Sequence, residues 1–333
     1  MDSNTVMLGP AQGGARGGAA TEPRSGRARA FWHWLSNDPR RLDYLDAAAR
    51  SRLDPTRVAA FAALHAGCLG VLVFGVSPVA VAVALALYVA RMFFITAFYH
   101  RYFAHRSFRA SRATQLVMAI LGCTAGQRGP LWWAGHHRTH HASADTRDDP
   151  HSPAHRGMLY SHMGWFLTVE SFAVPAHRVR DWLRYPELRI LERLDWVPFV
   201  LLAIGCYALG ALLESTAPAL GTNGPQMLVW GFFVSTVALY HATYTINSLA
   251  HRFGRRDFDT ADDSRNNPWL AALTLGEGWH NNHHFRPSSA RLGFRRWQID
   301  AGYAGLKLLE SLGLVRELKR APAQATARGG QRS

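Results

Sequence analysis

Nine histidines fall at spacings that could bind metal ions. Two segments repeat the pattern His-x-x-His-His, at residues 137–141 and at residues 280–284. On a helix, positions i, i+3 and i+4 share one face, so the imidazoles of each repeat can approach the same point. A single pair would most often be solvent-exposed and without function, but two such repeats in one chain indicate a metal centre. The full set consists of His100, His105, His137, His140, His141, His251, His280, His283 and His284.

The number and type of these side chains indicate two metal ions. Imidazole is the commonest neutral metal ligand near physiological pH. It favours iron, copper, zinc and nickel over hard cations, and nine imidazoles suit two ions with four or five ligands each. His100 and His105 would lie about 140° apart on an α-helix, so we expect them to serve different metals or to straddle a helix end. A dinuclear non-haem iron site would suit O2 activation and attack on an unreactive C–H bond.

The elements that must position these histidines are apolar runs that alternate with arginine-rich segments. A run of about 20 residues is about 30 Å long as a helix, which matches the hydrocarbon core of a bilayer. Stretches at residues 114–126 and 158–175 are too short or too interrupted to span, although five or six spans remain an alternative. Arg91 lies inside the second run, where it would either face protein in a functional role or snorkel to the interface. The four predicted spans are residues 58–76, 79–98, 197–213 and 228–249.

The distribution of charge sets the orientation of these spans. The formal net charge is +14, carried almost entirely by arginine, and together with the apolar runs it favours an anionic membrane surface over nucleic acid. The turns at Ser77-Pro78 and at residues 214–227 contain no Lys or Arg, whereas the other connecting segments are arginine-rich. The positive-inside rule therefore predicts that both termini and the central segment are cytoplasmic. All nine histidines then lie on one side, as a single site requires.

We therefore expect an all-α integral membrane protein with four transmembrane helices and a helical cytoplasmic cap that holds a di-iron site. The cap would comprise residues 99–196 and 250–320, within a folded domain of residues 31–320. The segments 1–30 and 321–333 are rich in Gly, Ala and Arg, a composition typical of disorder.

Two helices are expected outside the spans. A polar helix over residues 42–53 would precede the first span. An amphipathic helix over residues 297–316 would cap the cytoplasmic domain or lie on the membrane, with one apolar stripe formed by Ile299, Tyr303, Leu306 and Leu309.

Four blocks of the sequence resemble the membrane fatty acid desaturases of the stearoyl-CoA (acyl-CoA delta-9) desaturase family. Their order and placement are similar to that family over roughly residues 58–315. The resemblance implies a cone of four transmembrane helices under a cytoplasmic cap, with the nine histidines ligating two irons and Asn247 reaching a metal through a water. The blocks are residues 100–108, residues 137–141 followed by Asp149-Pro150-His151, residues 247–251 and residues 276–284.

The same resemblance implies an activity and a substrate tunnel. The activity would be insertion of a cis double bond, at delta-9, into a saturated fatty acyl chain, with O2 and two electrons consumed. Gln127, Trp133 and Thr243 would form a bend in the tunnel, and its closed end would lie near Ala84 and Tyr88. For Trp133, an aromatic at the membrane interface is the alternative.

Departures from the family leave the partners open. The family's aspartate before the second box is His136 here, which we do not expect to be a ligand. The basic pair that animal members use on the CoA phosphates is missing from residues 164–170. An acyl-CoA, an acyl-lipid and an acyl-carrier protein therefore all remain candidate substrates.

No haem-binding donor domain is visible, so electrons would come from a separate protein of the ferredoxin, rubredoxin or cytochrome type. A basic surface could dock an acidic donor, although the same charges would equally suit anionic lipid. This surface consists of Arg252, Arg255, Arg256, Arg286, Arg291, Arg295 and Arg296.

Two other functional classes compete with a desaturase. A histidine-rich di-iron hydroxylase acting on alkanes or lipids would share the His-x-x-His-His boxes, but the Asn-Ser-x-Ala-His block and the tunnel-bend residues favour desaturation. A metal transporter would need ligands within its spans, whereas these histidines flank them. We expect a location in a bacterial inner membrane, surrounded by membrane lipid, with no nucleic-acid partner.

Overall fold

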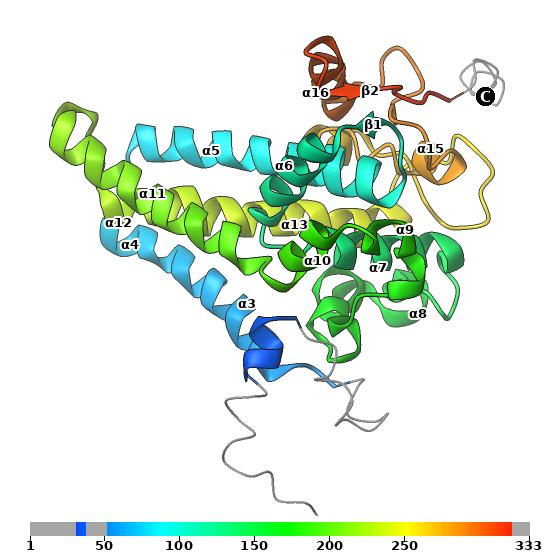
Figure 1. Ribbon diagram of the computed structural model, residues 1–333, viewed down its shortest axis with the longest axis horizontal. Helices are drawn as coiled ribbons and strands as arrows, with labels where there is room; N and C mark the ends of the chain where they lie inside the picture. Colours follow the sequence, from blue (N-terminus) through cyan, green and yellow to red (C-terminus); the bar gives the residue numbers. More distant parts are fainter. Residues whose placement is uncertain (1–30, 38–51, 322–333) are drawn as a thin grey trace, which may run out of the picture.

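The computed structural model describes residues 31–37 and 52–321. The predicted disordered N-terminus, nearly all of the predicted helix at 42–53 and the tail from residue 322 lie outside the described residues. Within them the chain is mostly helical, as predicted, with one small antiparallel sheet of β1 (Arg109–Ala110) and β2 (Val315–Arg316). Figure 1 shows the long helices at one end of the molecule and the short helices of a cap at the other.

Four helical segments among the described residues are long and apolar enough to cross a membrane, which confirms the four-span prediction. The second and fourth continue past their predicted ends into histidine-bearing segments. The spans are Pro55–Phe74, Pro78–Ala104, Trp196–Thr216 and Gly224–His251. They comprise α3 (Pro55–Gly67), η2 (Cys68–Gly70) and α4 (Val71–Phe74); α5 (Pro78–Phe93) and η3 (Phe94–Ala104); α11 (Trp196–Thr216); and α12 (Gly224–Met227), η9 (Leu228–Val234), α13 (Ser235–Ser248) and η10 (Leu249–His251).

Local sequence explains where the first two spans begin. Each starts with a proline at the first helical position, where the missing N–H costs nothing, after a residue that caps the helix. Asp54 accepts a hydrogen bond from the backbone N–H of Thr56 at 3.0 Å, and Ser77 accepts one from that of Ala80 at 3.1 Å. Gly75 turns the chain between the two spans with a φ of 68°, which favours glycine.

Arg91 lies inside the helix bundle and does not snorkel. Its side chain is 1% exposed. The guanidinium donates to the hydroxyl of Thr236 at 2.8 Å and to that of Ser235 at 2.5 Å, so it ties α5 to the fourth span. This contact with protein is one of the two ways in which a charge inside a membrane can be accommodated.

The cap is built from short helices that surround the end of η3. The apolar stretch at residues 158–175 breaks into three such helices, and the stretch at 114–126 forms a helix too short to span. The cap elements are α6 (Arg112–Cys123), α7 (Pro130–Ser143), α8 (Pro153–Arg156), η4 (Tyr160–Gly164), η5 (Trp165–Leu167), η6 (Glu170–Phe172), η7 (Ala176–Arg178), α9 (Arg180–Leu183), α10 (Pro186–Arg193), α14 (Pro268–Leu273), α15 (His280–Phe285) and α16 (Ala301–Ser311); η8 (Pro218–Leu220) lies between the third and fourth spans.

The prediction of one helix over residues 297–316 is wrong at both ends. Helix α16 begins at Ala301, because the Asp300 side chain accepts from the backbone N–H of Tyr303 and caps the helix there. It ends before Gly313, which has a φ of 71°, and the next residues form β2. Ile299 is therefore not on a helical stripe but is 77% exposed, whereas Leu306 is fully buried.

Candidate metal centre and adjoining cavities

The structure brings all nine predicted histidines together in two groups. Within each group the possible ligand atoms all lie within 4.8 Å of one another. The five-histidine group consists of His100, His105, His137, His141 and His283, and the four-histidine group consists of His140, His251, His280 and His284.

Each His-x-x-His-His repeat divides its side chains between the two groups. On α7, His137 and His141 belong to the five-histidine group and His140 to the other. On α15, His283 belongs to the five-histidine group, while its two repeat partners belong to the other. The sequence spacing predicted that each repeat contributes to one metal site, whereas in the structure each repeat contributes histidines to both groups.

His100 and His105 lie in the same group, so of the two predicted alternatives different metals is wrong, and a pair that straddles a helix end is confirmed, because His105 caps the end of η3. The prediction assumed α-helical winding, but η3 winds as a π-helix, with hydrogen bonds between residues five apart. The backbone N–H of His105 donates to the carbonyl oxygen of His100 at 3.2 Å. This winding places the second imidazole above the first, and such π segments are frequent at functional sites.

Four carboxylates orient four of the imidazoles from outside the groups. The distance from His100 Nδ1 to Glu277 is 2.5 Å, and that from His251 Nδ1 to Asp145 is 2.7 Å. His140 and His284 make the same contact at 3.0 Å with Asp149 and Asp262 respectively. A carboxylate at Nδ1 fixes the proton there and leaves Nε2 free to bind a metal, which is the usual arrangement around metal-ligating histidines.

These four acids have no role that the sequence motifs predict. Asp149 and Glu277 entered only as members of the resembling blocks. Both lie within ten residues of a box, as does Asp145, and this closeness was the one available signal. Asp262 is far from any box along the chain, and only the fold brings it to His284.

The electrostatic environment favours neutral imidazoles and charged carboxylates, the forms that suit metal binding. Burial lowers the pKa of His137, His141 and His283 well below the usual value, and the neighbouring imidazoles lower it further. Burial alone would raise the pKa of Glu277, but contact with His100 and Arg101 brings it below its usual value. His137, His141 and His283 are therefore neutral, and Glu277 is charged, at neutral pH.

The positions of the ring nitrogens fit metal ions between the imidazoles. In the five-histidine group, His283 Nε2 lies 3.0 Å from His100 Nε2 and 2.8 Å from His141 Nε2. Because Glu277 holds the proton of His100 at Nδ1, the Nε2 of His100 carries a lone pair that a cation between the rings would accept. In the other group, the buried Nε2 of His140 has no hydrogen-bond partner in the described part of the chain. Such an orphaned atom costs about 1–3 kcal/mol, which a metal ion would offset.

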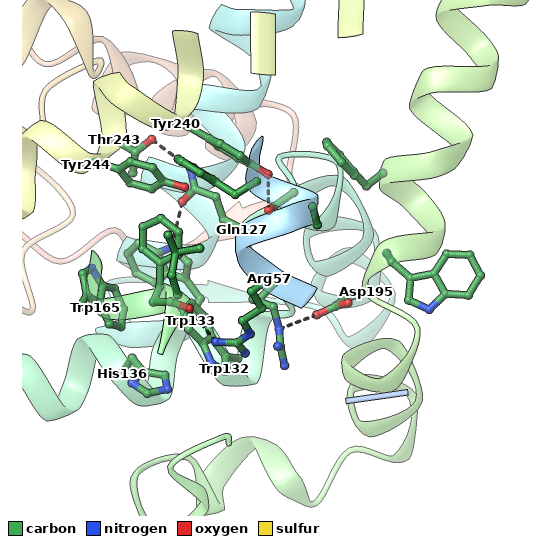
Figure 2. Close-up of a pocket in the computed structure, with 18 of the residues that line it drawn as sticks. Arg57, Gln127, Trp132, Trp133, His136, Trp165, Asp195, Tyr240, Thr243 and Tyr244 are labelled. Carbon is green, nitrogen blue, oxygen red and sulfur yellow. Dashed lines mark hydrogen bonds and ion pairs between the residues drawn. The ribbon is translucent and has the colours of Figure 1, made fainter. Parts of the chain in front are cut away.

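Two adjoining cavities lie beside the histidine groups. The first, of about 290 Å³, is lined mainly by aromatic side chains from α3, α7, α11 and α13, and the smaller second one continues from it past His100, His140 and His280. In Figure 2 Tyr240, Thr243 and Tyr244 lie on one side of the first cavity, and Trp132, Trp165 and His136 lie on the other. Both cavities are lined by Trp133, His137, Thr243 and Asn247.

Of the predicted bend residues, Trp133 and Thr243 line both cavities and Gln127 lines the first. The Gln127 amide donates to the hydroxyl of Thr243 at 3.1 Å, and the Trp133 indole N–H donates to Gln127 Oε1 at 3.4 Å (Figure 2). Asn247 lines both cavities, and the Ser161 hydroxyl donates to its backbone carbonyl at 2.8 Å.

Ala84 and Tyr88 do not line either cavity. They lie on α5 two turns and one turn before Met92, which lines the second cavity, so the three residues share one face of the helix. The Tyr88 hydroxyl donates to the carbonyl oxygen of Leu273 at 2.7 Å. Their assignment to the tunnel end stays a prediction.

His136 belongs to neither histidine group, in keeping with the expectation that it is not a ligand. Its Nε2 lies 3.1 Å from the carbonyl oxygen of Ala173, and its ring lines the first cavity. Burial lowers the pKa of His136 to about 3, so the ring is neutral.

Part of the predicted basic surface is paired with acidic side chains. Arg295 lies 3.2 Å from Asp257, and Arg256 lies 3.8 Å from Asp263. These contacts reduce the positive potential available to a docking partner.

Comparison with known proteins gives one consistent result. The sequence profile described as fatty acid desaturase matches residues 76–307. The sn-1 stearoyl-lipid 9-desaturase of Anabaena variabilis is 37% identical over 268 residues, which cover 78% of this chain and 92% of the relative. The acyl-CoA 5-desaturase AL21 of Anemone leveillei is 39% identical over 260 residues, covering 77% and 76%. The hex-5-enoyl-[acyl-carrier protein] acetylenase of Moorena producens is 34% identical over 257 residues, covering 74% and 78%.

Proposed function

This chain belongs to the fatty acid desaturase family, and we propose that it places a cis double bond at carbon nine of a saturated acyl chain carried by a membrane lipid. It is an integral membrane oxidoreductase that desaturates fatty acyl chains. One observation supports the proposal most strongly: a largely aromatic cavity leads directly beneath two histidine groups that fit metal ions. The position at carbon nine is supported by the name of the Anabaena relative.

We assign two iron ions as the cofactor, one to each histidine group, with Asn247 as a further ligand through a water. Imidazole donors suit iron, and nine of them exceed the capacity of one ion. Bound iron would supply the activation of O2 that removal of hydrogen from an unreactive methylene requires. The overall reaction consumes one O2, two electrons and two protons, and it yields the alkene and two water molecules.

The residues of the cavities select which methylenes react. An acyl chain has many similar methylenes, so the protein must select them by position. Gln127, Trp133 and Thr243 would hold the bend of the chain beneath the histidine groups, and the hydrogen bonds among them keep that bend rigid. Ala84 and Tyr88 would set the depth to which the methyl end can reach.

Two arginines in the first cavity support a lipid rather than CoA as the acyl carrier. Arg128 lies 3.3 Å from Asp195. Arg57 donates to the carbonyl oxygen of Phe166 at 2.6 Å and to the hydroxyl of Ser171 at 2.9 Å. Arg57 also lies 4.0 Å from Asp54, so each guanidinium has a carboxylate beside it that offsets part of the positive charge available to the several phosphates of CoA. A glycerolipid requires less positive charge from the site than CoA does.

The remaining assignments concern partners and orientation. The electrons would come from a separate ferredoxin, rubredoxin or cytochrome, docked at the basic surface. The cap and both termini would face the cytoplasm of a bacterium, with the spans in its inner membrane, because the turns between spans lack Lys and Arg.

Expression in a desaturase-deficient host tests the proposal. The lipids should gain acyl chains with a cis double bond at carbon nine, and a His283→Ala variant should give none while still inserting in the membrane. Hydroxylated chains without alkenes would instead support the histidine-rich hydroxylase. Double bonds at another carbon would contradict only the assigned position.

A further inference from the structure

Helix α3 forms a thin wall between the first cavity and the surrounding bilayer. None of its residues is buried, yet four of them line the cavity, namely Arg57, Ala60, Phe61 and Leu64. The ring of Phe61 stacks on that of Tyr240 of α13, with centroids 6.2 Å apart and planes 5° apart. The seam between α3 and α13 therefore closes one side of the cavity.

Three histidines outside the metal groups form a hydrogen-bonded chain along this seam. His65 Nε2 on α3 lies 3.0 Å from His241 Nε2 on α13. His241 Nδ1 lies 3.0 Å from His162 Nε2 on η4, whose Nδ1 lies 3.0 Å from the Ser248 hydroxyl. All three imidazoles are half-buried and none lines the cavity, although His65 and His241 each follow a residue that does. They therefore lie outside the cavity, and His65 and His241 lie within membrane spans, where an ionisable side chain points to a function.

The contacts define where the protons lie. His65 Nδ1 is 2.8 Å from the carbonyl oxygen of Phe61, which can only accept, so this nitrogen carries the proton. The Nε2 of a neutral His65 must then accept, and His241 must donate from its own Nε2. His241 in turn accepts at Nδ1 from His162 Nε2, and the Ser248 hydroxyl beside His162 Nδ1 is also 3.0 Å from the carbonyl oxygen of Tyr244, to which it can donate. With the proton of His65 at Nδ1, this is the one all-neutral arrangement in which both contacts between the three imidazoles are hydrogen bonds.

A candidate hinge follows α3, close to the three hydrogen-bonded histidines. Helix α3 gives way to the 3-10 turn η2 at residues 68–70, flanked by Gly67 and ending in Gly70. A short 3-10 segment inside a long helix often marks a hinge, and glycine permits the change of backbone angles. Both glycines touch η9, where an added Cβ would meet the side chains of Phe233 and Val229. The segment before the hinge can therefore move away from α13 while the hinge stays packed.

We propose that the acyl chain of a membrane lipid enters the cavity sideways through the seam between α3 and α13. During entry the Nε2–H of His241 exchanges its hydrogen-bond acceptor, from His65 Nε2 to the ester carbonyl of that lipid. When the seam is closed, His65 accepts this hydrogen bond. When α3 moves aside, the donor would face hydrocarbon unpaired, which is costly. The ester carbonyl of a lipid that enters the seam can accept this hydrogen bond, whereas an alkane has no acceptor.

This inference rests on the proposed lipid substrate and specifies how that substrate is recognised. A lipid with two chains cannot thread a cavity from the water side, because its second chain stays in the bilayer. The closing bond and the substrate bond use the same proton of His241. Loss of His65 therefore removes only the closing partner, while loss of His241 removes the donor that the substrate needs.

The test compares the two partners of the same hydrogen bond, using the intact enzyme in vesicles. The probes are a glycerolipid with a stearoyl ester and the same lipid with an octadecyl ether, which lacks the carbonyl, as a competitor. His241→Leu should raise the half-saturating fraction of the ester lipid about five- to tenfold, the worth of one hydrogen bond, with little change in kcat. His65→Leu should not raise it. His241→Gln, whose amide can donate, should restore it to within about twofold, and His177→Ala, at an exposed position of the cap, is the matched control.

The ether lipid should inhibit the wild type and the His241→Leu variant equally, because it offers no carbonyl. Equal weakening of ester binding by the two leucine variants, or weaker ether binding in His241→Leu, would show a purely structural role and overturn the inference. Iron content and the unfolding temperature of each variant identify a loss of folding. A wild type that desaturates stearoyl-CoA but no vesicle lipid would contradict the proposed substrate itself, and this inference with it.

Discussion

Replacing Asp262 by asparagine should weaken one of the two metal sites and leave the other intact. The carboxylate accepts from three donors at once: His284 Nδ1 lies 3.0 Å from Oδ2, and the backbone N–H of Ser264 and the hydroxyl of Thr260 lie 2.9 Å and 3.2 Å from Oδ1. Burial would raise the pKa of Asp262, but these bonds hold it well below its usual value, so the group is charged at neutral pH. Asparagine has one oxygen where aspartate has two.

The expected size of the effect follows from that geometry. If the amide oxygen of the introduced asparagine faces Ser264, its NH2 group faces His284 and moves the imidazole proton to Nε2, where the metal should bind. If the amide is flipped, its NH2 group opposes the N–H of Ser264. Either arrangement loses one good hydrogen bond at a group that orients a ligand. Such changes typically cost about tenfold to a hundredfold in metal affinity, or about 1.4–2.7 kcal/mol.

Chelator competition on purified protein, with iron counted per chain, measures this change. The Asp262→Asn variant should release one iron at a chelator concentration about tenfold to a hundredfold lower than the wild type, and should retain the other. Glu277→Gln should give the mirror result, because Glu277 orients His100 of the five-histidine group. Asp259→Asn, at a fully exposed aspartate nearby, should behave as wild type. Equal loss of both irons in the Asp262→Asn variant, or no loss, would refute the reasoning.

Three further predictions address the fold and the tunnel. Arg101→Met should lower the unfolding free energy by about 3–5 kcal/mol, because it strands the buried carboxylate of Asp300, 2.9 Å from the guanidinium; an unfolding temperature within a degree of wild type in detergent would contradict this. Ala84→Phe should shorten the preferred acyl chain without moving the double bond, as read by mass spectrometry of the products; a shifted double bond, or an unchanged chain preference, would show that the tunnel end lies elsewhere. Burial, with Asp195 adjacent, raises the pKa of Glu192, so the folded state binds more protons than the unfolded state. The free energy of unfolding should therefore fall as pH rises from about 4.5 through neutral. Glu192→Gln should flatten this dependence of the unfolding temperature on pH, and an unchanged dependence would exclude Glu192 as its source.

The spans and the meeting of the histidines could be predicted because they depend on one-dimensional signals. The length of an apolar run fixes whether it can cross a bilayer, and the arginines fix which side its ends take. Since the histidines flank the spans, any such topology gathers them. Whether Arg91 contacts protein or snorkels could not be predicted from the sequence, because its partners Ser235 and Thr236 lie on another span and no spacing pattern links them to it.

The sequence predictions that were wrong or incomplete concern contacts between distant segments or a helix that is not α-helical. The common grouping of His100 and His105 required a π-helix, which no residue pattern announces. Likewise, the helix expected at residues 297–316 is shortened because Val315 and Arg316 pair with residues 109–110 as a strand. The chain of His65, His162 and His241 joins residues that are isolated in the sequence, so only the fold could reveal it.

The fate of two hydrogens tests the central claim most directly. Purified enzyme, supplied with iron, O2 and a reduced donor, would be given a membrane lipid whose stearoyl chain carries deuterium at carbons nine and ten. The account predicts a cis alkene that has lost one deuterium from each of these carbons and gained no oxygen, with one O2 consumed per double bond. A product that keeps all but one deuterium and carries a hydroxyl group would contradict it, and would show that the same histidine groups support hydroxylation instead.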